Sequence, residues 1–140
     1  MTTRKAQLAA EVRTLRNRVV GVTDVVVASV DGLLITAETD DTAEPESLAA
    51  LTAATLNIAR RAGSMTHRGL LHHTVSQFTD GYLVTHSLGD MALIGVLGDA
   101  GMDITRLHTE AQASAQRITT LLTEPPADAG HHDRTGEGAR

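Results

Sequence analysis

The chain has 140 residues, a net charge of −5 and no cysteine. Its length suits a single domain with a core of its own. The lack of cysteine excludes disulfide frameworks, thiolate nucleophiles and cysteine-based metal sites. No apolar run reaches the roughly 18 residues of a membrane span, so we predict a cytoplasmic protein without membrane insertion. The acidic balance and the near absence of aromatic residues argue against nucleic-acid binding.

The N-terminal part predicts a basic amphipathic helix followed by a β-hairpin. Within residues 3–20, apolar residues recur at steps of four, three and four and so share one helix face: Leu8, Val12, Leu15 and Val19. Asp31-Gly32 then separates two apolar runs, 25–30 and 33–37. This pair predicts a two-residue turn in which both central residues have positive φ. Because strand 25–30 is apolar on both faces, it requires cover on both.

An acidic segment, 38–46, leads into a second predicted helix over 46–62, with Pro45 in its first turn and Gly63 as its C-terminal cap. We expect one stripe of this helix to face the sheet: Leu48, Leu51, Thr55, Ile58 and Ala62. The opposite side carries small and polar residues: Ala50, Ala53, Asn57 and Arg60. Alanine is a good helix former in any setting. Small side chains on an outer face would also let a second helix approach closely.

Three further strands are expected over 70–78, 82–87 and 91–97, followed by a last helix capped by Asp103. The first of these strands is polar, with His72, Thr74 and Ser76 on one alternating set, which suits a sheet edge. The last is apolar on both faces, as strand 25–30 is, so both should be central.

The predicted element order is therefore α-β-β-α-β-β-β-α. Helices on both faces of the sheet give an α/β (α+β) fold with a three-layer α/β/α sandwich. We assign residues 1–123 to this domain. Residues 124–140 contain two prolines, glycines and mixed charge, and we predict that they form a disordered tail.

Motifs for catalysis or metal binding are missing from the sequence. A P-loop requires a lysine, and the sole lysine, Lys5, lies in the first predicted helix. His72 and His73 are adjacent on a strand and so point to opposite faces. His86 and His108 have no companion at a metal-ligand spacing. We therefore predict no enzyme, no cofactor and no metal site.

Three segments in this order resemble the Roadblock/LC7 family, most of all its bacterial members of the MglB type and those of actinobacterial conservons. They are VVVASVDGLLITA, LAALTAATLNIARRAG and GYLVTHSLGDMALIGVLGD. The resemblance covers roughly residues 5–122, and its most recognisable part is the turn with Asp31 and Gly32.

The resemblance implies an antiparallel sheet in the order 2-1-5-4-3, with the second helix on one face and the other two helices on the opposite face. It also implies a homodimer formed by the third strands and second helices, and binding of a Ras-like small GTPase without binding of nucleotide by the chain itself. The interface would map onto one set of residues: Ala50, Ala53, Asn57, Arg60, His72, Thr74 and Ser76.

Three functional hypotheses follow. The first is a homodimeric adaptor that regulates a small GTPase, with the acidic segment 38–46 touching basic residues of the partner. In this case Arg60, Arg61 or Arg68 are candidates for an arginine supplied in trans. The second is a passive scaffold that links a sensor kinase-like protein to other components without affecting nucleotide turnover. The third is a small-ligand sensor, which would require a pocket with converging polar groups.

Overall fold

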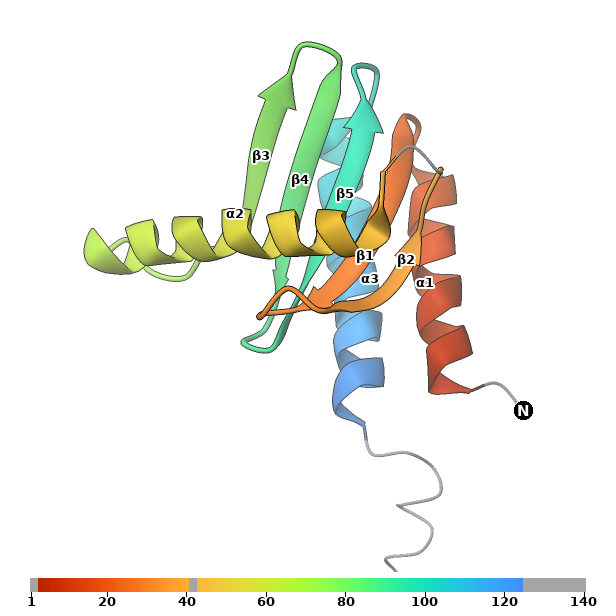
Figure 1. Cartoon of the computed structure of the whole chain (residues 1–140), viewed down its shortest axis with the longest axis horizontal. Coiled ribbons are helices and arrows are strands. Elements are labelled where there is room, and N and C mark those ends of the chain that lie inside the picture. Colours follow the sequence, from red (N-terminus) through yellow and green to blue (C-terminus); the bar gives the residue numbers. More distant parts are fainter. Residues whose placement is uncertain (1–2, 41–42, 125–140) are drawn as a thin grey trace, which may run out of the picture.

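The computed structural model describes residues 3–40 and 43–124. In chain order the elements are α1 (Arg4–Arg18), β1 (Val22–Ser29), β2 (Leu34–Glu38), α2 (Pro45–Met65), β3 (His73–Phe78), β4 (Gly81–Leu88), β5 (Ala92–Asp99) and α3 (Ile104–Thr123). The five strands form one antiparallel sheet in the order β2-β1-β5-β4-β3. Figure 1 shows α2 across one face of the sheet, with α1 and α3 on the other.

This architecture confirms the predicted element order, the three layers and the strand order that the family resemblance implied. The predicted tail, apart from Glu124 at the end of α3, lies outside the described residues. In the part of the chain that the structure describes, no helix is long and apolar enough to cross a membrane.

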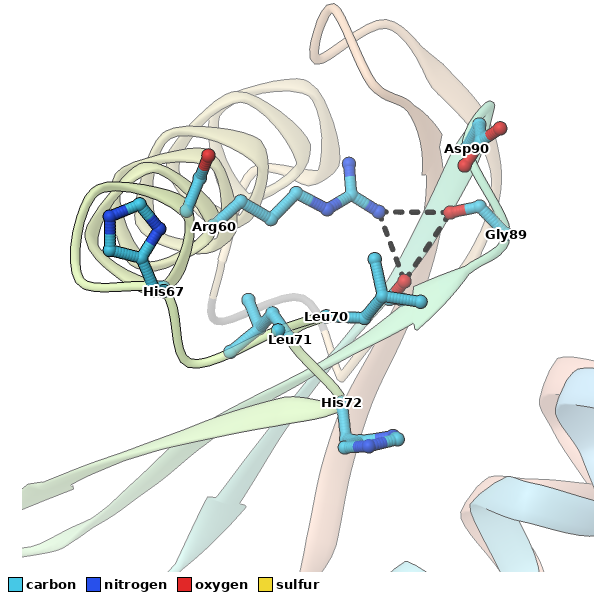
Figure 2. Close-up of a pocket in the computed structure, with 11 residues that line it drawn as sticks. Arg60, His67, Leu70, Leu71, His72, Gly89 and Asp90 are labelled. Atoms are coloured by element: carbon cyan, nitrogen blue, oxygen red, sulfur yellow. Dashed lines mark hydrogen bonds between the residues drawn. The ribbon is translucent and has the colours of Figure 1, made fainter.

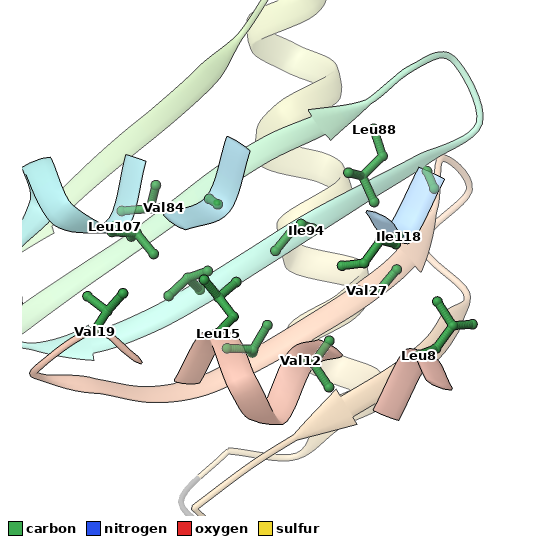
Figure 3. Close-up of a cluster of buried hydrophobic side chains, with 14 of the residues drawn as sticks. Leu8, Val12, Leu15, Val19, Val27, Val84, Leu88, Ile94, Leu107 and Ile118 are labelled. Atoms are coloured by element: carbon green, nitrogen blue, oxygen red, sulfur yellow. The ribbon is translucent and has the colours of Figure 1, made fainter. Parts of the chain in front are cut away.

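The middle of the sheet is buried on both faces, as the doubly apolar strands predicted. In β1, Val25 and Val27 belong to the core beneath α1 and α3, whereas Val26 and Ala28 lie beneath α2. Figure 3 shows the larger core, in which side chains of α1 and α3 meet the sheet around Ile94 of β5. Each such buried aliphatic side chain contributes roughly 1.5–3 kcal/mol relative to an exposed one.

The turn between β1 and β2 differs from the predicted one. Gly32 has a φ of 88°, but Asp31 does not share its positive φ. The Gly32 N–H donates to the Ser29 carbonyl at 2.9 Å, and the Ser29 N–H donates to the Leu33 carbonyl at 2.9 Å. This is a three-residue loop in which the glycine forms a bulge. The two-residue turn was therefore a wrong prediction, although the hairpin itself is confirmed.

Helix α2 is rotated relative to its predicted orientation. Leu51 and Ile58, which we expected to face the sheet, are 62% and 72% exposed. The sheet is instead contacted by the side that carries Ala49, Ala53 and Leu56. The helix also runs through Gly63 to Met65, so the predicted cap at Gly63 is wrong. Its predicted start, with Pro45 in the first turn, is confirmed.

Close contact between α2 and the sheet explains this rotation. A Cβ atom added to Gly95 of β5 would overlap the side chain of Thr52, with the Thr52 Cγ2 atom only 2.7 Å away. A Cβ atom on Gly32 would come within 3.3 Å of the Ala50 Cα atom. At these two points only small side chains fit between helix and sheet, and the orientation that places Thr52 and Ala50 there turns Leu51 and Ile58 outward.

The basic first helix and the acidic segment after β2 neutralise each other in part. Arg16 lies 3.2 Å from the carboxylate of Glu38 and 3.5 Å from that of Asp40. Arg13 lies 3.8 Å from Glu38. These partly exposed pairs each contribute about 0–1 kcal/mol. Part of the acidic segment that the adaptor hypothesis assigns to a partner is thus engaged within the chain.

We predict that Gly95→Ala lowers the free energy of unfolding by about 1–3 kcal/mol, because its new methyl group overfills the contact with Thr52. Adding Thr52→Ala should recover part of this loss, since two of the three nearest atoms are then gone. Urea denaturation of the single and double variants measures both effects.

Gly101→Ala is the matched control, because its Cβ atom would meet only the Asp99 Oδ1 atom, at an ordinary 3.4 Å. It should change stability by less than about 0.5 kcal/mol. Strictly additive losses in the Gly95→Ala/Thr52→Ala double variant would contradict the proposed close contact.

Candidate functional site

The outer face of α2 carries a row of exposed apolar side chains, which we call the α2 stripe: Leu51, Ala54, Ile58 and Met65. Leu51, Ile58 and Met65 follow one another at intervals of seven residues and therefore lie in line along the helix. Single exposed apolar residues are common on protein surfaces, whereas a row on one helix face indicates an interaction surface.

Strand β3 forms an open edge of the sheet next to this helix. Within the described residues it pairs with β4 alone, which confirms the edge position expected from its polar sequence. Val75 and Phe78 are 44% and 54% exposed. Figure 1 shows that the C-terminal end of α2 extends beyond this edge. The α2 stripe and the β3 edge are thus available to the same partner.

The residues predicted for the α2 part of the interface do not share one surface. Ala53 is only 3% exposed and lies between α2 and the sheet, so its placement on the outer face was wrong. The amide of Asn57 donates to the Val30 carbonyl at 3.0 Å. Arg60 also reaches toward strand ends, whereas Ala50 is exposed. The rotation of α2 buries Ala53 and brings the α2 stripe outward, while Ala50 and Asn57 stay exposed.

The residues predicted on the third strand are placed at or beside the β3 edge. Thr74 and Ser76 are half-buried on the α2 side of the strand, and the Thr74 hydroxyl is hydrogen-bonded to that of Thr85 at 2.7 Å. His72 is exposed and precedes the strand. The structure therefore brings these three residues together, but it does not test whether they contact a partner.

Arg60 anchors the turn between β4 and β5. Its guanidinium donates to the Ser87 hydroxyl at 3.0 Å and to the Gly89 carbonyl at 2.9 Å. Figure 2 shows this side chain beside a surface hollow of about 750 Å³, bordered by the end of α2, the segment that leads to β3, and the β4–β5 turn. Of the three arginines considered for action in trans, Arg61 and Arg68 are exposed, whereas Arg60 is engaged within its own chain.

A second polar site lies on the opposite face of the sheet, and the sequence analysis missed it. His73 of β3, His86 of β4 and His108 of α3 each place one ring nitrogen within 4.8 Å of the others. The ring centroids of His73 and His108 are 4.1 Å apart, and those of His73 and His86 are 5.5 Å apart. These three histidines, here called the histidine cluster, line a cavity of about 460 Å³.

The histidine cluster is electrostatically unusual. Burial, followed by the effects of the neighbouring His108 and His73, lowers the pKa of His86 to about 4. Burial, followed by the effect of His73, also lowers the pKa of His108. Among residues 3–40 and 43–124, neither the buried His86 Nε2 nor the buried His108 Nδ1 atom has a hydrogen-bond partner.

Two of the three histidines in this cluster could have been brought together from the sequence. The β3–β4 hairpin places His73 directly opposite His86. The two-residue turn at Thr79-Asp80 sets this register, because it pairs residues at equal distances from the turn. His108 could not be placed in this way, since its position depends on where α3 crosses the sheet.

Comparison with known proteins gives a consistent result. The family model described as Roadblock/LC7 domain matches residues 8–98. The Roadblock/LC7 domain from Streptomyces avermitilis superposes with a TM-score of 0.78 at 22% identity, covering 83% of this chain and 98% of that one. Among curated protein sequences, no match was found.

Two structures of MglB proteins are similarly close in fold. Myxococcus xanthus MglB has a TM-score of 0.77 at 14% identity and covers 84% of this chain and 89% of its own. The gliding protein MglB from Thermus thermophilus has a TM-score of 0.75 at 10% identity, with coverages of 86% and 92%. At such identities the structures show a shared fold, while the family model spans most of the described residues. The chain therefore belongs to the Roadblock/LC7 domain family.

Proposed function

We propose that this protein is a homodimeric, non-enzymatic adaptor that binds and regulates a Ras-like small GTPase. The observation that carries the proposal is the α2 stripe beside the open β3 edge. Similarity to MglB structures supports the same proposal, because the family resemblance implies dimers that regulate small GTPases.

A second copy of this chain can cover both the open β3 edge and the apolar α2 stripe of the first. If the β3 edges pair antiparallel, their free N–H and C=O groups bond to each other and the two sheets become one. The two α2 helices then lie on the same face, where their apolar stripes meet. Such an interface is self-complementary, as a two-fold dimer requires. The exposed Val75 and Phe78 of β3 would be covered in the same step.

Regulation of a GTPase by this dimer has two physical routes. The dimer can order the switch residues of the GTPase itself, which requires only a rigid surface of matching shape. Alternatively it supplies an arginine that stabilises charge on the transferred phosphoryl group. Arg61 and Arg68 are exposed and near the end of α2, so they are the candidates for the second route.

We predict that Ile58→Asp converts the dimer into monomers, because a carboxylate in the apolar contact between two α2 helices would lose its hydration without gaining a partner. Light scattering coupled to size-exclusion chromatography measures the mass. Since Ile58 is exposed in the single chain, circular dichroism should remain that of the folded wild type.

Val20→Asp is the matched control for this substitution. Val20 is 79% exposed, but it follows α1 and lies outside the α2 stripe and the β3 edge. It introduces the same charge and should leave the dimer intact. A dimer of unchanged affinity in Ile58→Asp would show that α2 does not form the interface.

We expect the wild-type protein to co-elute with a Ras-like GTPase from the same cell, beginning with those encoded beside it, and to change its rate of GTP hydrolysis or nucleotide exchange. Single-turnover hydrolysis and release of a fluorescent nucleotide measure the two rates. Ile58→Asp should bind the GTPase more weakly if the dimer forms the docking surface.

The same experiment separates the mechanisms. If an arginine acts in trans, Arg61→Ala or Arg68→Ala should lower the stimulated hydrolysis rate by about 10³-fold or more while binding persists. Full stimulation in both variants would assign catalysis to ordering of the GTPase's own residues. Binding with unchanged rates would favour a passive scaffold. If the protein neither binds the GTPase nor changes its rates, the adaptor proposal is refuted.

A further inference from the structure

The histidine cluster joins three elements on the face of the sheet opposite α2. His73 and His86 are paired across β3 and β4, and His108 reaches them from the first half of α3. His86 is 7% exposed, His108 is half-buried, and His73 lies at the exposed side of the cavity. Three imidazoles from separate elements thus converge on one partly enclosed space.

We propose that His73, His86 and His108 form a binding site for a divalent transition-metal ion, with zinc as its occupant. Three imidazoles satisfy three positions of a tetrahedral zinc site, and a water molecule takes the fourth. This inference concerns a single chain. It therefore does not depend on the dimer or on the GTPase partner proposed above.

The distances fit this assignment. Nitrogen ligands at about 2.1 Å from a tetrahedral zinc ion lie roughly 3.4 Å from one another. The three nitrogens already lie within 4.8 Å of one another. His73 is exposed, so rotation of its ring can close the remaining gap without disturbing the core.

In the part of the chain that the structure describes, the buried ring nitrogens of His86 and His108 lack hydrogen-bond partners, which also fits a metal site. A buried ring nitrogen without a hydrogen-bond partner carries a desolvation cost that a metal ion can offset. Within the described residues, His86 and His108 each have one such nitrogen. Only a neutral imidazole offers a lone pair to a metal, and burial favours this neutral form.

The α3 side of the cavity supplies polar neighbours for the ligands: Thr109, Gln112 and Gln116. Hydroxyl and amide oxygens at such positions can accept the second N–H of a ligating histidine and fix its orientation. The donor set consists of nitrogens rather than carboxylates, which favours zinc and its neighbours in the transition series over Mg²⁺ or Ca²⁺.

The test uses the full chain after treatment with a chelator and titration with zinc in a calorimeter. The background carries His131→Asn and His132→Asn, because adjacent histidines there could bind zinc on their own. We expect one ion per chain. His73→Gln and His108→Gln should each weaken zinc binding by more than about 100-fold, because loss of an outer hydrogen-bond partner alone costs about 10–100-fold.

His67→Asn is the matched control, since His67 is exposed and lies outside the cluster. Its φ is 58°, a conformation that asparagine also tolerates. This variant, and also Ile58→Asp, should bind zinc as the parent protein does. Because His86 is buried, its replacement would endanger folding. The decisive variant is therefore His73→Gln, since His73 is exposed.

A second readout is thermal unfolding with and without zinc. Zinc should raise the Tm of the parent protein and leave that of the His73→Gln/His108→Gln variant unchanged, because only binding to the folded state stabilises it. The absence of one-to-one binding in the parent, or equal affinity in this double variant, would overturn the proposal.

Discussion

The close approach of α2 to the sheet is the constraint on which the rest of the structure depends. Gly95 and Thr52 touch across this layer, and no larger side chain fits between them. Thr52 and its small neighbours Ala49 and Ala53 therefore face the sheet, and Leu51 and Ile58 point to the solvent. The packing that stabilises one chain thus also creates the apolar surface available to another.

The open β3 edge also leaves part of the sheet available to another chain. Solvent-exposed edge strands are usually protected by lysine, proline or a bulge, because a bare edge pairs readily with other strands. The sequence of β3, HTVSQF, contains neither lysine nor proline, and it pairs with β4 in an unbroken register. Its Val75 and Phe78 are partly exposed. An edge of this kind is suited to being covered by a partner strand.

The sequence predicts those features that depend on local pattern. Strand 25–30 had to be central because it is apolar on both faces, and Pro45 marked the start of α2. The rotation of α2 was not predictable, since both of its sides are apolar and periodicity favours the side with the larger residues. The narrow space that decides between them is set by Gly95, far away in the sequence.

The two candidate sites meet at one strand. Thr74 and Ser76 of β3 face the α2 layer, while His73 on the same strand faces α3. Among the described strands, β3 is held by β4 on one side only. Ordering β3 therefore costs conformational entropy, which reduces the free energy gained when a partner docks. A metal ion shared by His73 and the more deeply held His86 and His108 would restrain the strand beforehand. Occupancy of the histidine cluster would then strengthen pairing at the β3 edge, because less conformational entropy remains to be lost when the second strand arrives.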